Sequence, residues 1–363
     1  MLRRRLRDLT KNTPRVRVNV VRVVLLKKYK EMIKMMRQID LRWHLRVSLL
    51  PECNLRCRYC NPEGNFEDSE TLNSQEILDI VKAAVANGIV RVHWTGGEPC
   101  LTDIVSILES SKKLGMKEQI MTTNNGTLQV DRVHEMKQAG LNRVNISLDS
   151  LNPSKNKEIT GRNLFSNTVK WIESACNIFD EVTKMNIVPM RDNINEIEEF
   201  IKFAQRFNGK LLLKFIELCP NNPAFYNTDI QRYHVSRQEI VGELEKIGTL
   251  KKTTAVGDNP NAEYYQVGDI GVTIIFVTMP SQNYKCGLEK CRKMRISPFG
   301  IAGSCIQQKG KQLKGISLEQ KIQTIGQLID LRNSYSDVAP VARRHFRGEL
   351  GFWRFGKIKK EVS

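Results

Sequence analysis

Long hydrophobic runs are missing from this 363-residue sequence: no stretch of 18 apolar residues occurs, which excludes a conventional membrane-spanning helix. The first residues, MLRRRLRDL, lack the apolar segment and the small-residue cleavage site of a secretory signal, so we expect a cytoplasmic protein. Cysteine is also scarce. Nine cysteines are too few for a disulfide scaffold in a chain of this length, and their spacing is more informative than their number.

Acidic residues are outnumbered in this chain, with 39 Asp and Glu against 57 Lys and Arg and a net charge of +18. Residues 1–40 hold 13 basic and three acidic side chains, which makes this segment a basic N-terminal arm. Such a balance favours an anionic partner, such as nucleotide phosphates, nucleic acid or a membrane surface, but a solvated basic surface explains the arm equally well. The arm contains no serine, which disfavours an organelle transit peptide.

Short β-rich runs alternate with helical patterns through the middle of the chain. The runs are at 45–50, 90–95, 119–123, 143–147, 182–189 and 211–217. The helical pattern EILDIVKAAVANG follows a capping signal formed by Asn73 and Glu76 and ends at Gly88. Strands that alternate with helices predict βα units and a parallel sheet. We therefore expect an α/β fold with a partial (β/α)6, TIM-like barrel over residues 41–235.

The alternation stops after about residue 235, and a smaller C-terminal region is expected over residues 236–363. Its sequence predicts a short helix at 236–248, a polar loop at 256–265 and a β-rich segment at 267–279. No internal repeat other than the βα period is evident.

Six of the nine cysteines form two triplets. Cys53, Cys57 and Cys60 have the spacing C-x3-C-x2-C, and Cys286, Cys291 and Cys305 have the spacing C-x4-C-x13-C. Thiolates are soft ligands for zinc or for iron–sulfur clusters. A structural zinc site needs four ligands, and the first triplet has no fourth cysteine or histidine nearby. We therefore favour a 4Fe-4S cluster with one open iron, and zinc is the alternative.

Small and polar residues follow the predicted strands at the points where the strands end. They are Gly96, Gly97, Glu98, Pro99, Thr122, Thr123, Asn124, Ser147, Asp149 and Glu217. In parallel βα folds, binding and catalytic groups collect at the carboxyl ends of strands, on the loops that follow. We expect one functional site at that edge of the sheet.

The segments CNLRCRYC, WTGGEP, TTNNG and RVNISLDSL together resemble the radical S-adenosylmethionine (SAM) superfamily. With VTKMNIVP, FIELCP and CRKMRISPFGIAGSC they resemble, more narrowly, the MoaA-type GTP 3′,8-cyclase family of molybdenum cofactor biosynthesis. The resemblance extends from about residue 44 to residue 310. It implies a lyase that cleaves SAM to a 5′-deoxyadenosyl radical, which then abstracts hydrogen from the substrate.

This resemblance also implies roles for individual residues. Cys53, Cys57 and Cys60 would hold a 4Fe-4S cluster that binds SAM, and Cys286, Cys291 and Cys305 would hold an auxiliary 4Fe-4S cluster. The SAM-binding residues would be Gly97, Glu98, Thr123, Asn124 and Ser147. The residues that bind the phosphates of an anionic substrate, GTP in the first instance, would be Arg46, Lys184, Lys293 and Arg295. An electron donor such as flavodoxin or ferredoxin is expected, and nucleic acid is not expected as a partner.

The chain departs from the family pattern at several places. The spacing between Cys286 and Cys291 is x4 where x2 is usual, and the sequence ends KIKKEVS where the family ends in Gly-Gly. Three positions where the family commonly has arginine are occupied by His93, Lys214 and Lys293. These differences favour a second hypothesis, a paralogue that acts on another nucleotide, a small metabolite or a peptide. A third, a zinc-stabilised nucleic-acid-binding protein, leaves GGEP, TTNNG and SLD unexplained.

Overall fold

The computed structural model describes seven stretches of the chain. They are residues 43–60, 70–124, 130–218, 232–253, 262–277, 291–304 and 310–334. The chain divides into two units, residues 1–41 and residues 42–363. The predicted basic arm thus falls outside the described residues, all of which belong to the second unit.

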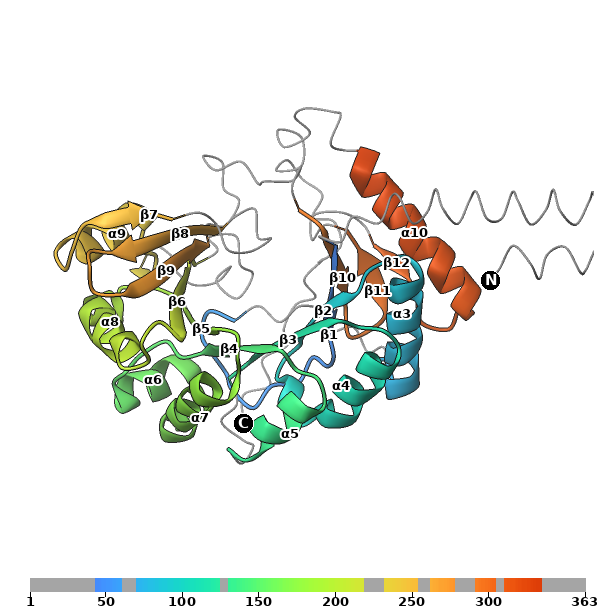
Figure 1. Cartoon of the computed structure of the whole chain (residues 1–363), viewed down its shortest axis with the longest axis horizontal. Coiled ribbons are helices and arrows are strands. Elements are labelled where there is room, and N and C mark those ends of the chain that lie inside the picture. Colours follow the sequence, from blue (N-terminus) through green and yellow to red (C-terminus); the bar gives the residue numbers. More distant parts are fainter. Residues whose placement is uncertain are drawn as a thin grey trace, which may run out of the picture. The chain divides into compact units, whose positions relative to one another are not determined.

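Six parallel strands form the centre of the sheet (Figure 1). They are β1 (His44–Ser48), β2 (Arg91–Thr95), β3 (Glu118–Thr123), β4 (Arg143–Ser147), β5 (Thr183–Ile187) and β6 (Leu211–Ile216). Each pairs in parallel with the next one along the chain. The connecting helices are α3 (Ser74–Ala86), η1 (Pro99–Leu101), α4 (Ile104–Lys113), α5 (Arg132–Gln138), α6 (Pro153–Thr160), α7 (Phe165–Ile178), η2 (Ile194–Glu196) and α8 (Ile197–Gln205). The predicted partial (β/α)6 barrel is confirmed.

The C-terminal strands extend the same sheet at both of its edges. They are β7 (Leu250–Lys252), β8 (Ala262–Val267), β9 (Val272–Val277), β10 (Lys293–Ile296), β11 (Ile301–Gly303) and β12 (Lys311–Gln312). The order is β12-β11-β10-β1-β2-β3-β4-β5-β6-β9-β8-β7, so the sheet is open, with β12 and β7 as the edges among the described strands. Both β10 and β9 pair in parallel, with β1 and β6 respectively. The boundary predicted at residue 235 therefore falls within one sheet.

Two further helices follow residue 235, α9 (Arg237–Glu245) and α10 (Leu318–Ser334). Helix α9 matches the predicted helical stretch, and β9 matches the predicted β-rich segment. The predicted polar loop over 256–265 is wrong at its end, because residues 262–265 belong to β8. The antiparallel pairing of β8 with β9 places Tyr264 in the buried part of the sheet, which local polarity did not indicate.

Side chains alternate along the central strands, so that the sheet has one apolar and one polar face. The apolar face includes Leu45, Val47, Val92, Trp94, Met121, Val144, Ile146, Met185, Leu213 and Phe215, all buried. These residues form one core with helix residues such as Ile80, Trp171 and Phe200, and the helices α3, α4, α5, α7 and α8 lie on this side (Figure 1). Parallel strands covered by apolar layers on both faces are apolar nearly throughout. The alternation therefore indicates that the second face lines a polar site.

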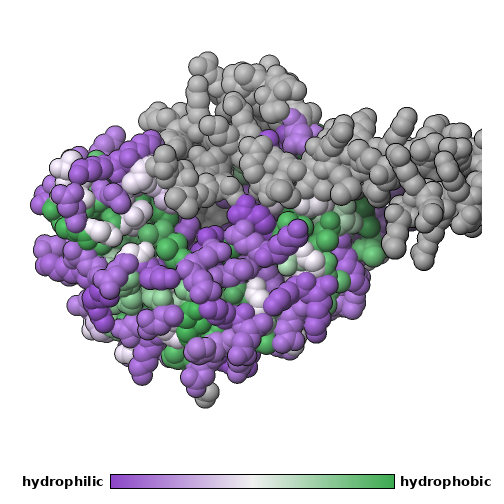
Figure 2. All heavy atoms as spheres, in the orientation of Figure 1, coloured by the Kyte–Doolittle hydropathy of each residue, from purple (hydrophilic) through white to green (hydrophobic). Residues whose placement is uncertain are grey.

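On the face of the described residues seen in Figure 2, hydrophilic side chains predominate, with hydrophobic side chains scattered between them. Few large hydrophobic side chains are exposed in the described ranges, with Leu101 at 45% as the most exposed. No helix in the described part of the chain is long and apolar enough to cross a membrane.

Helix α3 begins where the sequence predicts. The Asn73 side chain accepts a hydrogen bond from the Glu76 backbone N–H at 3.0 Å, and the Glu76 carboxylate accepts one from the Asn73 backbone N–H at 2.9 Å. These two bonds form a capping box, which satisfies backbone donors that have no partner within the helix. Beyond the last turn, Gly88 has φ 79°, a left-handed conformation that ends the helix.

We expect Asn73→Ala to lower the free energy of unfolding by about 0.5–2 kcal/mol, because the substitution removes the side-chain acceptor of the cap. Urea denaturation of wild type and variant measures the difference. The neighbouring substitution Ser74→Ala is the control: Ser74 is exposed, and its removal should change stability by less than about 0.5 kcal/mol. Equal stability of Asn73→Ala and Ser74→Ala would contradict the role of the cap.

Candidate functional site

The three cysteines of the first triplet lie on a short turn between β1 and α3. Cys53 and Cys57 are half-buried and Cys60 is exposed. The backbone N–H of Cys60 donates to the Cys57 carbonyl at 3.0 Å, and the N–H of Leu55 donates to the Cys53 sulfur at 3.4 Å. The turn thus presents three thiols from one compact segment of backbone.

This turn is fastened to the C-terminal end of α6. The backbone N–H groups of Arg56 and Arg58 donate to the carbonyl oxygens of Thr160 and Ile159 at 2.8 and 3.1 Å. The carbonyl oxygens at a helix end have no partner within the helix. These bonds therefore satisfy the last carbonyl groups of α6 and two N–H groups of the cysteine turn. Gly161 follows with φ 73°, and a Cβ there would lie only 3.1 Å from the Cβ of Arg56.

The surroundings of the three cysteine thiols favour the binding of a positively charged metal centre. Burial raises the pKa of Cys57 well above its ordinary value, and negative charge on Asp149, Cys60 and Cys53 raises it further. Burial also raises the pKa of Cys53. Three thiolates this close together repel one another unless a metal centre offsets their charge. No three Cys, His or carboxylate side chains of the described ranges converge on a single metal ion, whereas the ligands of an iron–sulfur cluster bind separate irons.

The two glycines after β2 pack directly on the backbone in front of the cysteine turn. The N–H of Gly97 donates to the Leu50 carbonyl at 2.7 Å, and the N–H of Glu98 donates to the Glu52 carbonyl at 2.8 Å. A Cβ on Gly97 would lie 1.8 Å from the Glu52 oxygen, well inside contact distance. Only glycine permits this approach.

The carboxylate of Glu98 is fully buried and accepts three hydrogen bonds. Its donors are the Thr123 hydroxyl at 2.5 Å, the Asn124 backbone N–H at 2.8 Å and the Cys100 backbone N–H at 3.0 Å. A buried carboxylate is stable only when such donors surround it. The end of β2 is thereby joined to the end of β3.

Asn124 continues this network to the cysteine turn. Its side-chain NH₂ group lies 3.0 Å from the Asn54 side-chain oxygen and 3.7 Å from the Cys53 sulfur. The hydroxyl of Thr168 donates to the Asn124 carbonyl at 3.1 Å. Four of the five predicted SAM-binding residues, Gly97, Glu98, Thr123 and Asn124, therefore lie together beside Cys53. The fifth, Ser147, lies at the end of β4, with its hydroxyl 3.5 Å from the Asn186 side-chain NH₂ group.

A buried pair that the sequence did not reveal supports the same turn from the other side. The Tyr59 hydroxyl donates to the Asp149 carboxylate at 2.5 Å, and the Val188 backbone N–H donates to it at 2.8 Å. Burial raises the pKa of Asp149 to about 6, against the lowering effect of these two donors. Asp149 was expected at this edge, but a single tyrosine within a cysteine motif carries no pattern that identifies its partner.

The four predicted phosphate-binding residues lie on the polar face of the sheet. Arg46 of β1 is the register partner of Arg295 of β10 on one side and of His93 of β2 on the other. One Arg46 guanidinium nitrogen lies 3.3 Å from the His93 Nδ1. Lys293 is paired with His44. Positive side chains of β10 and β1, with the His93 imidazole of β2 beside them, thus line one side of the polar face.

Lysines of β5 and β6 complete this cationic face. Burial lowers the pKa of Lys184 to about 8, with a further contribution from Arg143. Burial also lowers the pKa of Lys214 to about 7, and positive charge on Lys184, Lys293 and Arg46 lowers it further. The Lys184 ammonium lies 5.9 Å from the centroid of the Tyr264 ring. Lys214 was noted in the sequence only as a departure from arginine, and the structure places it among the other cations.

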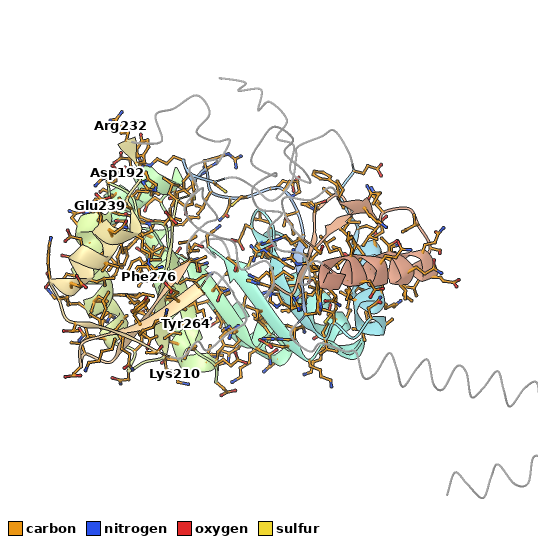
Figure 3. All side chains as sticks on the ribbon, turned by 90° about the horizontal axis from the view of Figure 1, so that it is seen from above. Asp192, Lys210, Arg232, Glu239, Tyr264 and Phe276 are labelled. Atoms are coloured by element: carbon orange, nitrogen blue, oxygen red, sulfur yellow. The ribbon has the colours of Figure 1, made fainter. Side chains whose placement is uncertain are left out.

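The carboxyl ends of the strands, where the cysteine turn lies, can be located in Figure 3. Lys210, which precedes β6, and Asp192, which follows β5, lie at opposite ends of these strands (Figure 3). The side chain of Asp192 forms an ion pair with Arg58 of the cysteine turn, at 2.5 Å.

The second cysteine triplet is described in part: Cys291 is half-buried just before β10, and Cys286 and Cys305 lie outside the described residues.

Comparison with known proteins agrees with this arrangement. Residues 47–204 match the Radical SAM superfamily. The GTP 3′,8-cyclase of Vibrio vulnificus (strain CMCP6) is 33% identical over 321 residues, which cover 85% of this chain and 90% of the relative. The GTP 3′,8-cyclase of Petrotoga mobilis is 34% identical over 276 residues, which cover 74% and 82%. The chain belongs to the GTP 3′,8-cyclase family of the radical SAM superfamily.

The fold of this radical SAM enzyme is shared with more distant relatives. The crystal structure of Streptococcus suis SuiB bound to S-adenosylmethionine has a TM-score of 0.55 at 17% identity, with 85% of this chain and 69% of that chain covered. At that identity the likeness concerns the fold alone. Membership of the family makes SAM and 4Fe-4S clusters the cofactors of this enzyme, while the assignment of single residues to them stays a prediction.

The contact between Gly97 and Glu52 gives a test of the site's construction. We expect Gly97→Ala to lower the free energy of unfolding by about 1–3 kcal/mol, because the new methyl group must push the backbone before Cys53 aside. The iron content of the reconstituted protein should fall as well.

The matched control is Gly242→Ala in α9, where a Cβ meets nothing within 4 Å. That change should raise stability by about 0.5–1 kcal/mol, because alanine favours the helix, and it should leave the iron content unchanged. Urea denaturation and iron determination on both variants measure these effects. Wild-type stability and iron in Gly97→Ala would show that the close approach is not needed.

Proposed function

We propose that this chain is a GTP 3′,8-cyclase-like radical SAM enzyme. The observation that carries the proposal is the gathering of cations on the polar face of a sheet whose carboxyl edge bears the cysteine turn. These cations are Arg46, Lys184, Lys293 and Arg295. The names of the relatives, which are about a third identical to the chain, support GTP as the substrate.

Two cysteine triplets supply the proposed cluster ligands. Cys53, Cys57 and Cys60 would hold one 4Fe-4S cluster, and Cys286, Cys291 and Cys305 the other. When bound, the first cluster and SAM supply a 5′-deoxyadenosyl radical that removes hydrogen from the substrate. Each triplet is one ligand short of a 4Fe-4S cube, so each cluster would have an iron free to bind a small molecule.

The proposed SAM contacts are Gly97, Glu98, Thr123, Asn124 and Ser147. The Glu98 carboxylate is already held by Thr123 and Asn124, so its negative charge is fixed before an ammonium group arrives. A charge held in advance stabilises its ligand without the cost of reorganising the side chain. Burial of this carboxylate also keeps water from competing for it.

The proposed role of the cationic face is to bind the triphosphate of GTP. Arg46 and Arg295 each have a planar guanidinium that can make two parallel bonds to phosphate oxygens. Lys184 and Lys293 act as point charges, which makes Lys293 the weakest contributor where the family has arginine. Like charges this close together are unfavourable until an anion occupies the space between them.

The proposed reaction needs a source of electrons. Reductive cleavage of SAM consumes one electron, and we propose a donor such as flavodoxin or ferredoxin in the cytoplasm. The alternative function differs only in its substrate: another nucleotide, a small metabolite or a peptide. The histidine and lysine at positions 93 and 214, where arginine is common in the family, favour that alternative.

The first test concerns the separate roles of the two cysteine triplets. Replacing Cys53, Cys57 and Cys60 together by Ala should remove about half of the iron and all SAM cleavage. Cys291→Ala should still cleave SAM slowly but form no product, because the second cluster only positions what the radical attacks. Iron analysis and anaerobic product assays measure both effects. Full iron in the triple variant, or normal product from Cys291→Ala, would contradict the assignment.

The second test concerns the binding of GTP by the cationic face. Each charge-assisted contact to phosphate contributes about 1.5–3 kcal/mol, so Arg46→Ala, Lys184→Ala and Arg295→Ala should each weaken GTP binding by about 10- to 150-fold. The control is Arg206→Ala, which removes a surface arginine paired with Glu173 and should leave GTP affinity unchanged. Anaerobic titration gives the affinities. If wild type does not bind GTP, or if all three variants bind it as wild type does, the alternative substrate is favoured.

A further inference from the structure

Two asparagine side chains on the polar face of the sheet each have an amide oxygen without a hydrogen-bond donor. They are Asn145 of β4 and Asn186 of β5, with exposed fractions of 5% and 6%. Neither oxygen accepts a hydrogen bond from any group in the described part of the chain. A buried polar atom without a partner lowers stability, so such atoms are rare unless water or a ligand supplies the partner.

A chain of hydrogen bonds holds the amide of Asn145 in place. Arg46 can only donate, so the His93 Nδ1 at 3.3 Å accepts from it and the proton of the imidazole lies on Nε2. This Nε2 lies 2.7 Å from the Thr122 hydroxyl, to which the NH₂ group of Asn145 also donates, at 3.3 Å. The NH₂ group of Asn145 is thereby engaged, and its amide oxygen lies on the other side of the planar group.

Asn186 has the second open amide oxygen, on the neighbouring strand. Its NH₂ group lies 3.5 Å from the hydroxyl of Ser147, its register partner in β4. Asn145 is the register partner of Lys184, two residues before Asn186, so the two asparagines are offset by about 7 Å along the strand direction. Both lie on the side of the sheet that carries the cations, because residues two apart in a strand point the same way.

The chemical group that best fits these two amides is a hydroxyl. A hydroxyl donates through its proton and accepts through its lone pairs, so it can pair with either end of an amide. If the Asn145 amide were turned over, its oxygen would meet Thr122 and its NH₂ group would be open, and a hydroxyl would still satisfy it. An ionised phosphate oxygen can only accept and is repelled by an amide oxygen, and an ammonium group is repelled by the cations of this face.

We propose that Asn145 and Asn186 bind hydroxyl groups of the substrate's sugar, so that the polar face recognises a ribonucleotide by its sugar as well as by its phosphates. This inference rests on the proposed function, which assigns the nucleotide to the same face. The asparagines are buried, whereas the longer side chains of Arg46 and Lys184 are half-buried. The cations attract any polyanion, but a site that pairs with a hydroxyl rejects an analogue that lacks it.

The measurement is anaerobic titration of GTP, 2′-deoxy-GTP and 3′-deoxy-GTP into the enzyme carrying both clusters, without reductant. We expect wild type to bind at least one deoxy analogue about 5- to 150-fold more weakly than GTP, because the missing hydroxyl leaves a buried amide unpaired. Asn145→Leu and Asn186→Leu should each remove the discrimination against the analogue that lacks the hydroxyl bound there. Comparing two ligands on one variant cancels any general effect of the substitution on phosphate binding.

The matched control is Asn156→Leu. Asn156 of α6 is also buried, and its amide oxygen also has no donor among the residues described, but it lies on a helix and not on the polar face. This variant should discriminate between GTP and the deoxy analogues as wild type does. Asn145→Ser and Asn186→Ser, whose side chains are too short to replace the amide, serve in place of a leucine variant that does not fold. The comparison of ligands on wild type needs no variant.

The outcomes separate this inference from the proposed function. Equal affinity of wild type for GTP and both deoxy analogues overturns the inference and leaves the proposed function standing. The same holds if the asparagine variants discriminate as wild type does, or if they lose affinity for SAM instead, which would assign the two amides to SAM. If GTP fails to bind but ATP binds, with a discrimination against its deoxy analogues that the variants abolish, the sugar site stands and GTP is not its ligand. If none of these nucleotides binds, both are overturned.

Discussion

The buried carboxylate of Glu98 is the interaction on which the rest of the site depends. It holds the end of β3 through Thr123 and Asn124, while its own backbone N–H is held by Glu52, the residue before Cys53. Removing donors from a buried carboxylate costs several kcal/mol. The hydrogen bonds of Glu98 therefore hold the ends of β2 and β3 and the backbone before Cys53 in fixed relative positions. The position of the cysteine turn is thereby determined by the ends of two strands, and those ends are determined by the core behind them.

The hydrophobic core and the candidate site lie on opposite faces of one sheet. The apolar face, with residues such as Trp94, Met121 and Phe215, packs against the helices and supplies the favourable burial. The polar face gathers cations that repel one another, which lowers stability in the absence of a ligand. This loss of stability is typical of a binding site, where charged groups are positioned to bind a ligand and not to stabilise the empty protein.

The features that were predictable from the sequence are local ones. The six central strands, the cap at Asn73 and the cysteine spacing each depend on neighbours within a few residues, and periodicity reveals them. The pairing of Tyr59 with Asp149 and the lowered pKa of Lys214 depend on residues that are distant along the chain and meet only in the folded sheet. The strand at 262–267 was partly missed for the same reason, because its pairing with β9 outweighs its polar composition.

The parallel pairing of β1 with β10 has a consequence for how the chain is made. Residues 44–47 pair with residues 293–296, so about 250 residues must be synthesised after β1 before its second neighbour exists, roughly 12–50 s at ribosomal rates. During that interval β1 is an edge strand whose backbone donors and acceptors are open on one side. Helix α10, which lies against α3 through the bond from Asn87 to the Ile322 carbonyl, is added later still. The nascent barrel therefore spends most of its translation with the β1 edge unprotected.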